Sequence, residues 1–428
     1  MSEGIRLLRP DRSQIQLEVV DLDSQLPADH YARIVWAFVE TLDLSAFHAR
    51  IKVRDDLPGR PASDPAVLLA VWLYATVEGV GSARAVARLC EQHAAYRWLC
   101  GGVPVNHDML SAFRRESGAL LDNLLTQTLT GLIAEGLIKL EEVAIDGTKV
   151  RSRAGHNSLA ARERFDRIET AVRQRVAKLK SELEEDASSA ERKRRARTLR
   201  VATERAARIQ RAREKLAQFE AEKAERAKRD KRAAKTEAKV SLSDPEVRQM
   251  RMPDGSVHPG WNVQVATAKG FVVAIDPTDR RNDTGLAPDL VENIRQRCGV
   301  VPETLLADAT AMTIDDLVTL NATAPNLTVY SPTPKEREDI SEAGQRNRES
   351  QRKHEPKVVQ QWRERMASDA GKEVYRRRKL TEHAHAKMKN RGFGRMPVHG
   401  IAKVRSVCFL HAITHNLMHA HGLRRVST

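Results

Sequence analysis

The sequence predicts an α/β domain that is interrupted by a charged helical hairpin and preceded by an all-helical region. Apolar residues recur at helical spacing through about the first 135 residues, and β-prone runs begin near Leu140 and return after Pro245. Between them, no glycine or proline stands from His156 to Asp244. A chain of 428 residues is expected to form two or three domains. Aromatic residues make up only 4% and charged residues 30%, so an all-β fold is nearly excluded.

The N-terminal region is predicted to be a compact helical domain. Apolar residues keep helical spacing from Pro65 to Leu99, and the Gly-Val-Gly-Ser sequence at 79–82 divides this stretch into two helices. Asp64 directly before a proline is a helix-start signal. A second pair of helices is expected after Asn106-His107-Asp108, and its later member runs from Leu120 to Ile138.

Short strands are predicted on both sides of the glycine-free stretch. The run after Leu140 is β-prone and meets Asp146 and Gly147, which indicates a strand that ends in a turn. Residues 261–276 form two apolar runs around Lys269-Gly270, a pattern typical of a β-hairpin.

The remaining segment continues the α/β alternation. A helix is predicted at 287–298, and the apolar strand at 303–308 ends in Asp308. A weak strand follows at 327–330, a polar mobile loop at 335–357, and mostly helix from 360 to 421.

The glycine-free stretch is predicted to be an antiparallel pair of helices at residues 161–240. Apolar residues alternate at spacings of three and four on either side of a polar break at 184–189. This segment holds 26 Lys and Arg against 15 Asp and Glu, a net charge of +11. It either contacts nucleic acid or is a solvated charged helix pair, and the sequence leaves both open.

The whole chain carries a formal charge of +15, from 72 basic and 57 acidic residues, which indicates a polyanionic partner. The alternative is a merely basic protein. No apolar run is long enough for a membrane span or a secretion signal, because the best one, 65–77, is flanked by Asp64 and Glu78. The four cysteines include no CxxC pair, so neither a zinc ribbon nor a disulfide framework is predicted, and a cytoplasmic location is expected.

Three acidic residues are candidate metal ligands. Asp146 and Asp308 each follow a predicted strand, and Glu382 lies among basic residues in a late helix. Carboxylates on separate elements are the hard oxygen ligands that a pair of Mg²⁺ ions needs for phosphoryl chemistry. In a chain with 57 acidic residues this choice is weak evidence by itself.

The surroundings of Glu382 make the choice more specific. Tyr375, Arg378, Glu382 and Lys389 form the pattern Tyr-x2-Arg-x3-Glu-x6-Lys, which places all four within roughly 60° of one helix face. Such a face would present an acidic ligand, a phenol and two cations to metal and phosphate together. The alternative is an ordinary salt-bridged helix surface.

With these residues, the chain resembles DDE transposases of bacterial insertion sequences that carry the same Tyr-Arg-Glu-Lys signature, most closely the insertion-sequence-eleven-eighty-two type. The resemblance covers nearly the whole chain. The matching segments are Gly59–Pro61 with Asp64-Pro65, Tyr96–Leu99, His107–Ser111 with Phe113–Arg115, Ile145–Thr148, Asn262–Val265, Ala307–Ala309 and Tyr375–Glu382.

The resemblance implies a ribonuclease H-like catalytic domain and a function. Asp146, Asp308 and Glu382 would be catalytic and would ligate Mg²⁺, with Mn²⁺ as a substitute and no nucleotide cofactor. Tyr375, Arg378 and Lys389 would contact the transposon end. We also expect basic side chains of the N-terminal domain to contact DNA there, namely Arg84, Arg88, Arg114 and Arg115. The partners would be double-stranded DNA, as terminal inverted repeats and target, and further copies of the chain in a dimer or larger complex; the protein would act in the bacterial cytoplasm, at the nucleoid when bound to DNA.

This resemblance divides the chain into four segments. Residues 1–137 would bind the transposon end, 138–160 would begin the catalytic domain, 161–240 would be the helical insertion, and 241–428 would complete the catalytic domain and add C-terminal helices.

Three alternatives stay open. After Asp308 the chain has Ala-Thr-Ala instead of the family's usual Ala-Gly-Tyr, and after Glu382 it has His-Ala-His-Ala instead of Pro-Val-Phe-Gly, so a decayed transposase that only binds DNA is one alternative. A structural or RNA-binding coiled-coil protein is another. The third is a zinc site at His411, His415 and His419, which stand four residues apart.

Overall fold

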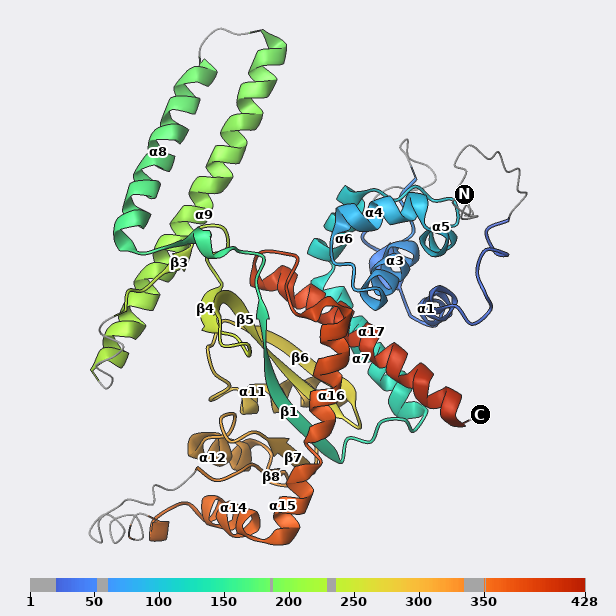
Figure 1. Cartoon of the computed structure of the whole chain (residues 1–428), viewed down its shortest axis with the longest axis vertical. Coiled ribbons are helices and arrows are strands. Elements are labelled where there is room, and N and C mark those ends of the chain that lie inside the picture. The colour runs from blue at the N-terminus through green and yellow to red at the C-terminus, as the bar shows by residue number, and fades with distance from the viewer. Residues whose placement is uncertain are drawn as a thin grey trace, which may run out of the picture.

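The computed structural model describes residues 21–51, 61–184, 188–228, 236–334, 350 and 352–427. Figure 1 shows a group of N-terminal helices beside a central sheet, a long helical hairpin that projects from the sheet, and C-terminal helices that cross both parts. The predicted helical N-terminal region followed by an α/β region is confirmed. The N-terminal helices are α1 (Tyr31–Glu40), α2 (Ser45–His48), α3 (Pro65–Val77), α4 (Ala83–Gln92), α5 (Ala94–Cys100), α6 (His107–Glu116) and α7 (Gly118–Ala134).

Helix α3 is the centre of the N-terminal region. It begins as predicted, because the Asp64 side chain accepts a hydrogen bond from the Ala66 N–H at 2.8 Å. Nearly all of its residues are buried. The predicted second helix after Gly79–Ser82 is divided in two, because His93 adopts an extended backbone and caps α5 with its ring nitrogen. Helix α7 also ends earlier than predicted, at Ala134.

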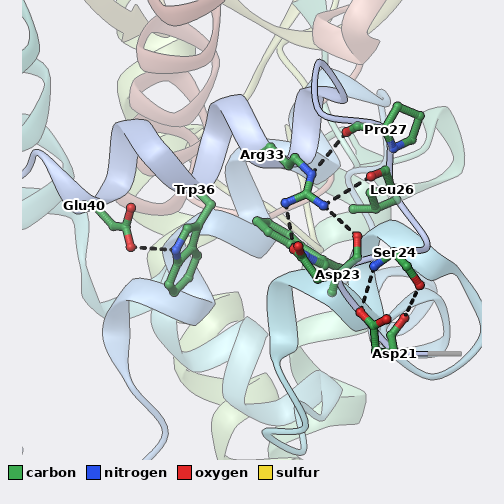
Figure 2. Close-up of polar contacts among 9 residues, drawn as sticks. Asp21, Asp23, Ser24, Leu26, Pro27, Arg33, Trp36 and Glu40 are labelled. Atoms are coloured by element: carbon green, nitrogen blue, oxygen red, sulfur yellow. Dashed lines mark hydrogen bonds and ion pairs between the residues drawn. The ribbon is translucent and has the colours of Figure 1, made fainter.

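Side-chain hydrogen bonds hold the segment before α1 against the neighbouring helices. Figure 2 shows Arg33 reaching back to Asp23 and to the backbone carbonyls of Leu26 and Pro27. The Asp23 carboxylate also accepts a hydrogen bond from the Trp98 indole at 3.0 Å. Charged and neutral donors therefore converge on one exposed carboxylate, whose pKa they hold below its ordinary value, with the Arg33 hydrogen bond as the main cause.

The central sheet combines antiparallel and parallel pairing. Its order is β4-β5-β1-β7-β8, and β6 also pairs with β5. Strands β4, β5, β6 and β1 pair antiparallel, whereas β7 runs parallel to β1 and β8 runs parallel to β7. The strands are β1 (Glu142–Arg151), β4 (Arg248–Arg251), β5 (Val257–Ala268), β6 (Phe271–Thr278), β7 (Thr304–Ala307) and β8 (Thr328–Tyr330).

The prediction that the first strand ends in a turn at Asp146 and Gly147 is wrong. Both residues lie inside β1, where Asp146 pairs with Val265 and Gly147 with Gln264 in the antiparallel ladder with β5. Pairing with β7 stops at Ile145. Asp146 is therefore the first residue of β1 whose side toward β7 is open, and this opening creates the site described below.

Two long helices stand where the charged helical pair was predicted. Helices α8 (Arg162–Glu184) and α9 (Ser189–Ala227) pack against each other and project from the sheet in Figure 1. The short strands β2 (Leu159–Ala160) and β3 (Val240–Ser241) pair at the base of the hairpin. A separate apolar cluster fills this base, with Phe165, Leu216 and Phe219 among its members.

The C-terminal helices cover the sheet and reach the N-terminal region. They are α14 (Lys357–Ala367), α15 (Asp369–Arg376), α16 (Lys379–Met388) and α17 (Ile401–Ser427), after α11 (Ala287–Cys298) and α12 (Ile314–Thr323). A short π-helical turn, Lys389–Phe393, follows α16. Helix α17 packs on β6, α7 and α3, and the Asn416 side chain bonds both the N–H and the carbonyl of Val272. Most of the predicted loop at 335–357 lies outside the described residues.

None of the described helices is long and apolar enough to cross a membrane.

Candidate active site

Asp146 lies at the point where β1 and β7 separate. Helix α16 packs over this part of β1 and β5, and a 2.8 Å hydrogen bond between the hydroxyls of Thr267 and Thr381 fixes it there. The Asp146 carboxylate lies 3.5 Å from the Arg378 guanidinium and 3.6 Å from Nδ1 of His385. One aspartate of the sheet thus meets side chains from the segment that carries the predicted signature.

The environment of Asp146 raises its pKa to about 6. Burial is the main cause, and the negative charges of Asp283 and Asp308 add to it, while Arg378 opposes them. His385 does not supply a compensating charge, because burial and the nearby cations Lys389 and Arg378 lower its pKa to about 4. Carboxylates therefore crowd this position, and Arg378 is the cation that balances them.

Asp308 follows β7 directly, as predicted. Its carboxylate accepts hydrogen bonds from the Ala309 N–H at 2.8 Å and from the Thr310 hydroxyl at 3.3 Å. Its carbonyl accepts one from the Ser331 hydroxyl, which ties the turn to the residue after β8. Because β7 pairs with β1 up to Ala307 and Ile145, Asp308 and Asp146 are adjacent at the separating ends of the two strands.

Arg378 connects Glu382 to Asp146. Nη2 of Arg378 donates to Glu382 at 3.2 Å, while Nη1 faces Asp146. The Glu382 side chain is 57% exposed, so it lies at the mouth of the site. Arg378 thus bridges the two carboxylates.

The prediction that Tyr375, Arg378, Glu382 and Lys389 share one face of a single helix is wrong in one respect. Helix α15 ends at Arg376 and α16 begins at Lys379, so the Tyr-Arg-Glu-Lys pattern runs across a helix junction. Arg378 still lies over the Tyr375 ring, at 5.9 Å from its centre. Tyr375 therefore belongs to the group, whereas Lys389 has no ion pair with a carboxylate among the residues that the structure describes.

Asp283 is a further acidic residue of this region that the sequence analysis did not single out. It lies in the loop between β6 and α11, and its carboxylate accepts hydrogen bonds from Asn262 at 2.8 Å and Gln264 at 2.6 Å. The carboxylate fills the space beside Gly147 that a Cβ atom would occupy. No local pattern marks Asp283, although the Asn262–Val265 match already pointed to the two amides that hold it.

The two arginines predicted to contact DNA from α6 have different surroundings. Arg114 is only 6% exposed and stacks on Trp72. Arg115 is exposed and pairs with Glu116 at 2.5 Å.

Within the described ranges, no group of three or more His, Cys, Asp or Glu side chains could hold a metal ion. This result leaves the zinc alternative without support, and two of its histidines instead bond the backbone of the β5–β6 turn: His415 contacts the Gly270 carbonyl and His419 the Lys269 carbonyl. Asp146, Asp308 and Glu382 likewise do not form such a group in this arrangement, in which Arg378 bridges Asp146 and Glu382.

Comparison with known families finds transposase domains in two parts of the chain. Residues 20–116 match a transposase domain (DUF772), and residues 337–421 match a transposase DDE domain. Two segments of the chain, one near each end, thus match transposase domains. The second match contains Tyr375, Arg378, Glu382 and Lys389, whereas Asp146 and Asp308 lie outside both. Neither a curated protein nor a solved structure matches the chain.

Proposed function

We propose that the protein is a DDE transposase of the insertion-sequence-eleven-eighty-two type, which binds terminal inverted repeats and catalyses DNA strand cleavage and strand transfer. The observation that carries this proposal is the Arg378 bridge, because it joins the DDE-matching segment to the aspartate in the middle of the sheet. The sheet supports a ribonuclease H-like fold, since an antiparallel group of strands continues through β1 into two parallel ones. The four segments predicted from the sequence are proposed as its domains.

The carboxylates suit a hard divalent cation. Negative charge is concentrated around Asp146, where burial, together with the charges of Asp283 and Asp308, raises its pKa, and a single guanidinium offsets it. Mg²⁺, or Mn²⁺ in its place, would be held by Asp146, Asp308 and Glu382. When bound, it would polarise the phosphodiester and stabilise the negative charge that develops on its oxygens. The reaction exchanges phosphodiester bonds, so no nucleotide is needed.

The protein's own residues position the reacting strand. Water attacks phosphorus at the element's end and the bond to the 3′ oxygen breaks. The released 3′-hydroxyl then attacks a phosphorus of target DNA and displaces a 3′ oxygen of the target strand. Arg378 and Tyr375 lie beside Asp146, where they would contact the phosphate next to the broken bond, and exposed Lys389 would contact the DNA backbone. Because two ends must be joined, the active form is a dimer or larger assembly.

One second candidate is favoured by a specific observation. Arg378 bridges Asp146 and Glu382, and no group of three metal-binding side chains is present in the described part of the chain. A transposase that has lost cleavage and only binds DNA would have such a neutralised site.

The test is cleavage of DNA that carries the element's own ends, with and without Mg²⁺. Asp308→Asn and Glu382→Gln keep side-chain shape and remove a charged ligand, so cleavage falls by at least about two orders of magnitude while end binding changes little. Glu373→Gln on α15, an exposed residue paired with Arg376, is the matched control and keeps wild-type cleavage. Wild-type protein that binds the ends but never cuts them with Mg²⁺ or Mn²⁺ would establish the DNA-binding alternative.

A further inference from the structure

A pocket of about 640 Å³ lies where the N-terminal helices meet the C-terminal segment that follows α16. Arg84 and Arg114 line it from the N-terminal side, Arg153 from the end of β1, and Arg391 and Arg395 from the C-terminal side. This volume is in the range of small-ligand sites and exceeds what a crevice between packed side chains would leave.

Positive charge in the pocket is not neutralised by the protein. None of these five arginines forms an ion pair with a carboxylate among the residues that the structure describes, and Asp108 is the one acidic residue in the described lining. Asp108 itself is exposed and lies 3.5 Å from His107. Guanidinium groups gathered without carboxylates indicate an anionic ligand, because like charges repel one another when left unpaired.

Two of the arginines have buried side-chain atoms. Arg114 is 6% exposed, stacks 4.2 Å from the centre of the Trp72 ring and donates to the Gly81 carbonyl at 2.8 Å. Burial, with a smaller contribution from the charge of Arg153, lowers the pKa of Arg114 to about 10. Arg391 carries a buried Nη1 that has no hydrogen-bond partner in the structure. A buried donor without a partner costs stability, so it marks a place where a ligand atom is expected.

The backbone keeps the two sides of the pocket together. Gly79 and Gly392 both have positive φ, and a Cβ atom on Gly392 would lie 3.1 Å from the Gly79 carbonyl. The C-terminal side is also joined to β1, because Arg151 exchanges hydrogen bonds with Gly394 and Met396. The pocket is therefore a preformed feature of the domain junction.

Strand β1 connects this pocket to the candidate active site. Asp146 and Arg153 are seven residues apart along nearly extended chain, a span of about 23 Å at 3.3 Å per residue. A DNA strand advances about 3.4 Å per nucleotide, so the same distance corresponds to roughly seven nucleotides. One strand lying along β1 would reach both places.

We propose that this arginine pocket binds backbone phosphates of the transposon-end DNA, about seven nucleotides from the phosphodiester that is cut. The inference rests on the proposed function, since it takes DNA as the partner. The pocket lies at a fixed distance from Asp146. A DNA strand bound in the pocket would therefore be held with a defined phosphodiester at the active site. Several phosphates, or a nucleotide with its flanking phosphates, fit the five arginines better than a single phosphate does.

The experiment is phosphate-ethylation interference on end DNA bound to the full-length protein, scored by position. Wild-type protein shows interference roughly six to eight nucleotides from the repeat's cleavage end. Arg391→Ala and Arg153→Ala lose this signal, raise the Kd about tenfold and reduce the salt slope by about 0.9 for each lost phosphate contact. Arg295→Ala, which removes an exposed arginine paired with Glu292 on α11, keeps the signal. Ser111→Leu narrows the pocket without changing charge and weakens the same signal.

Interference is read on the bound complex, so it reports on the pocket even if the protein cuts nothing and the proposed activity fails. Thermal unfolding of each variant establishes that it is folded. Two results would overturn the inference. One is that Arg391→Ala and Arg153→Ala give the same Kd and the same interference pattern as Arg295→Ala. The other is that wild-type protein shows no interference roughly six to eight nucleotides from the cleavage end. Stabilisation of wild-type protein by a free mononucleotide or inorganic phosphate at micromolar concentration, with no interference, would identify a small-anion site and overturn it as well.

Discussion

The carboxylate of Asp283 lies directly against the Cα atom of Gly147, in the space that the Cβ atom of any other residue would occupy. The Asn262 and Gln264 amides hold it there. A glycine in the middle of a strand ordinarily weakens it, because it has no side chain to pack. Here the missing side chain allows a loop carboxylate to approach β1 one residue from Asp146. The glycine is therefore a requirement of the site rather than of a turn.

Gly147→Ala is expected to disturb the site and the fold together. The new Cβ atom would overlap Oδ1 of Asp283 and approach Nε2 of Gln264, so the loop must move. Overpacking of this kind costs about 1–3 kcal/mol of unfolding free energy, and cleavage falls with it. Urea unfolding and the cleavage assay measure the two effects. Gly155→Ala, where a Cβ atom meets nothing within 4 Å, is the control. Unchanged stability in Gly147→Ala would contradict the described packing.

Arg378→Ala should make the protein more dependent on a divalent cation. Asp146 would lose the guanidinium that lies 3.5 Å away and stay crowded by Asp283 and Asp308. An unpaired, partly buried carboxylate costs about 1–3 kcal/mol. Added Mg²⁺ should then raise the Tm of this variant more than that of the wild type, because a cation replaces the lost charge. Thermal unfolding with and without Mg²⁺ measures this difference.

The matched control is Arg377→Ala. Arg377 is 58% exposed and pairs with Glu142 at the edge of the same region. Its loss should change the Tm little and leave the Mg²⁺ response as in the wild type. If both variants respond to Mg²⁺ alike, the Arg378 bridge has no role in balancing the carboxylates.

Much of the site could be predicted because short patterns report on local chemistry. Asp308 after an apolar strand and the Tyr375-Arg378-Glu382 spacing were recognised, and the structure places Arg378 against both Tyr375 and Glu382. The sequence around Asp146 and Gly147 predicts a turn, because only the pairing with β5 shows that β1 continues through these residues.

The missed features depend on contacts between distant segments. Asp283 lies 21 and 19 residues from the amides that hold it, in a loop with no periodic pattern. The residue type of Arg114 predicts a contact with DNA, but it does not predict where the side chain lies. Its burial over Trp72 depends on how α6 packs against α3, which no count of charges reveals.

DNA affinity should depend steeply on salt. The chain carries a formal charge of +15, and exposed Lys and Arg side chains cover the hairpin of α8 and α9. Each phosphate neutralised on duplex DNA contributes about −0.9 to the slope of log affinity against log salt, so six contacts give about −5. Fluorescence anisotropy between 50 and 300 mM salt, roughly the accessible range, measures this slope. A slope shallower than about −3 would mean that most of the basic surface is merely solvated.

Stability should fall as the pH drops below the ordinary range of histidine titration. Burial is the main cause that lowers the pKa of His411 to about 3 and of His415 to about 4, against 6.5 for an exposed histidine. Between pH 6.5 and about 4 the unfolded chain binds protons that the folded chain does not, so unfolding becomes easier. Each such histidine contributes at most about 1.4 kcal/mol per pH unit.

His415→Gln separates this contribution from other acid effects. A glutamine amide does not titrate, and it can still donate to the Gly270 carbonyl that His415 contacts at 2.8 Å. The variant should therefore show a shallower loss of unfolding free energy between pH 6.5 and about 4, measured by urea unfolding at several pH values. His156→Gln, at an exposed residue before β2, should keep the wild-type slope. Equal slopes in wild type and His415→Gln would show that His415 takes up its proton over the same pH range in the folded protein as in the unfolded chain, against a pKa lowered by burial.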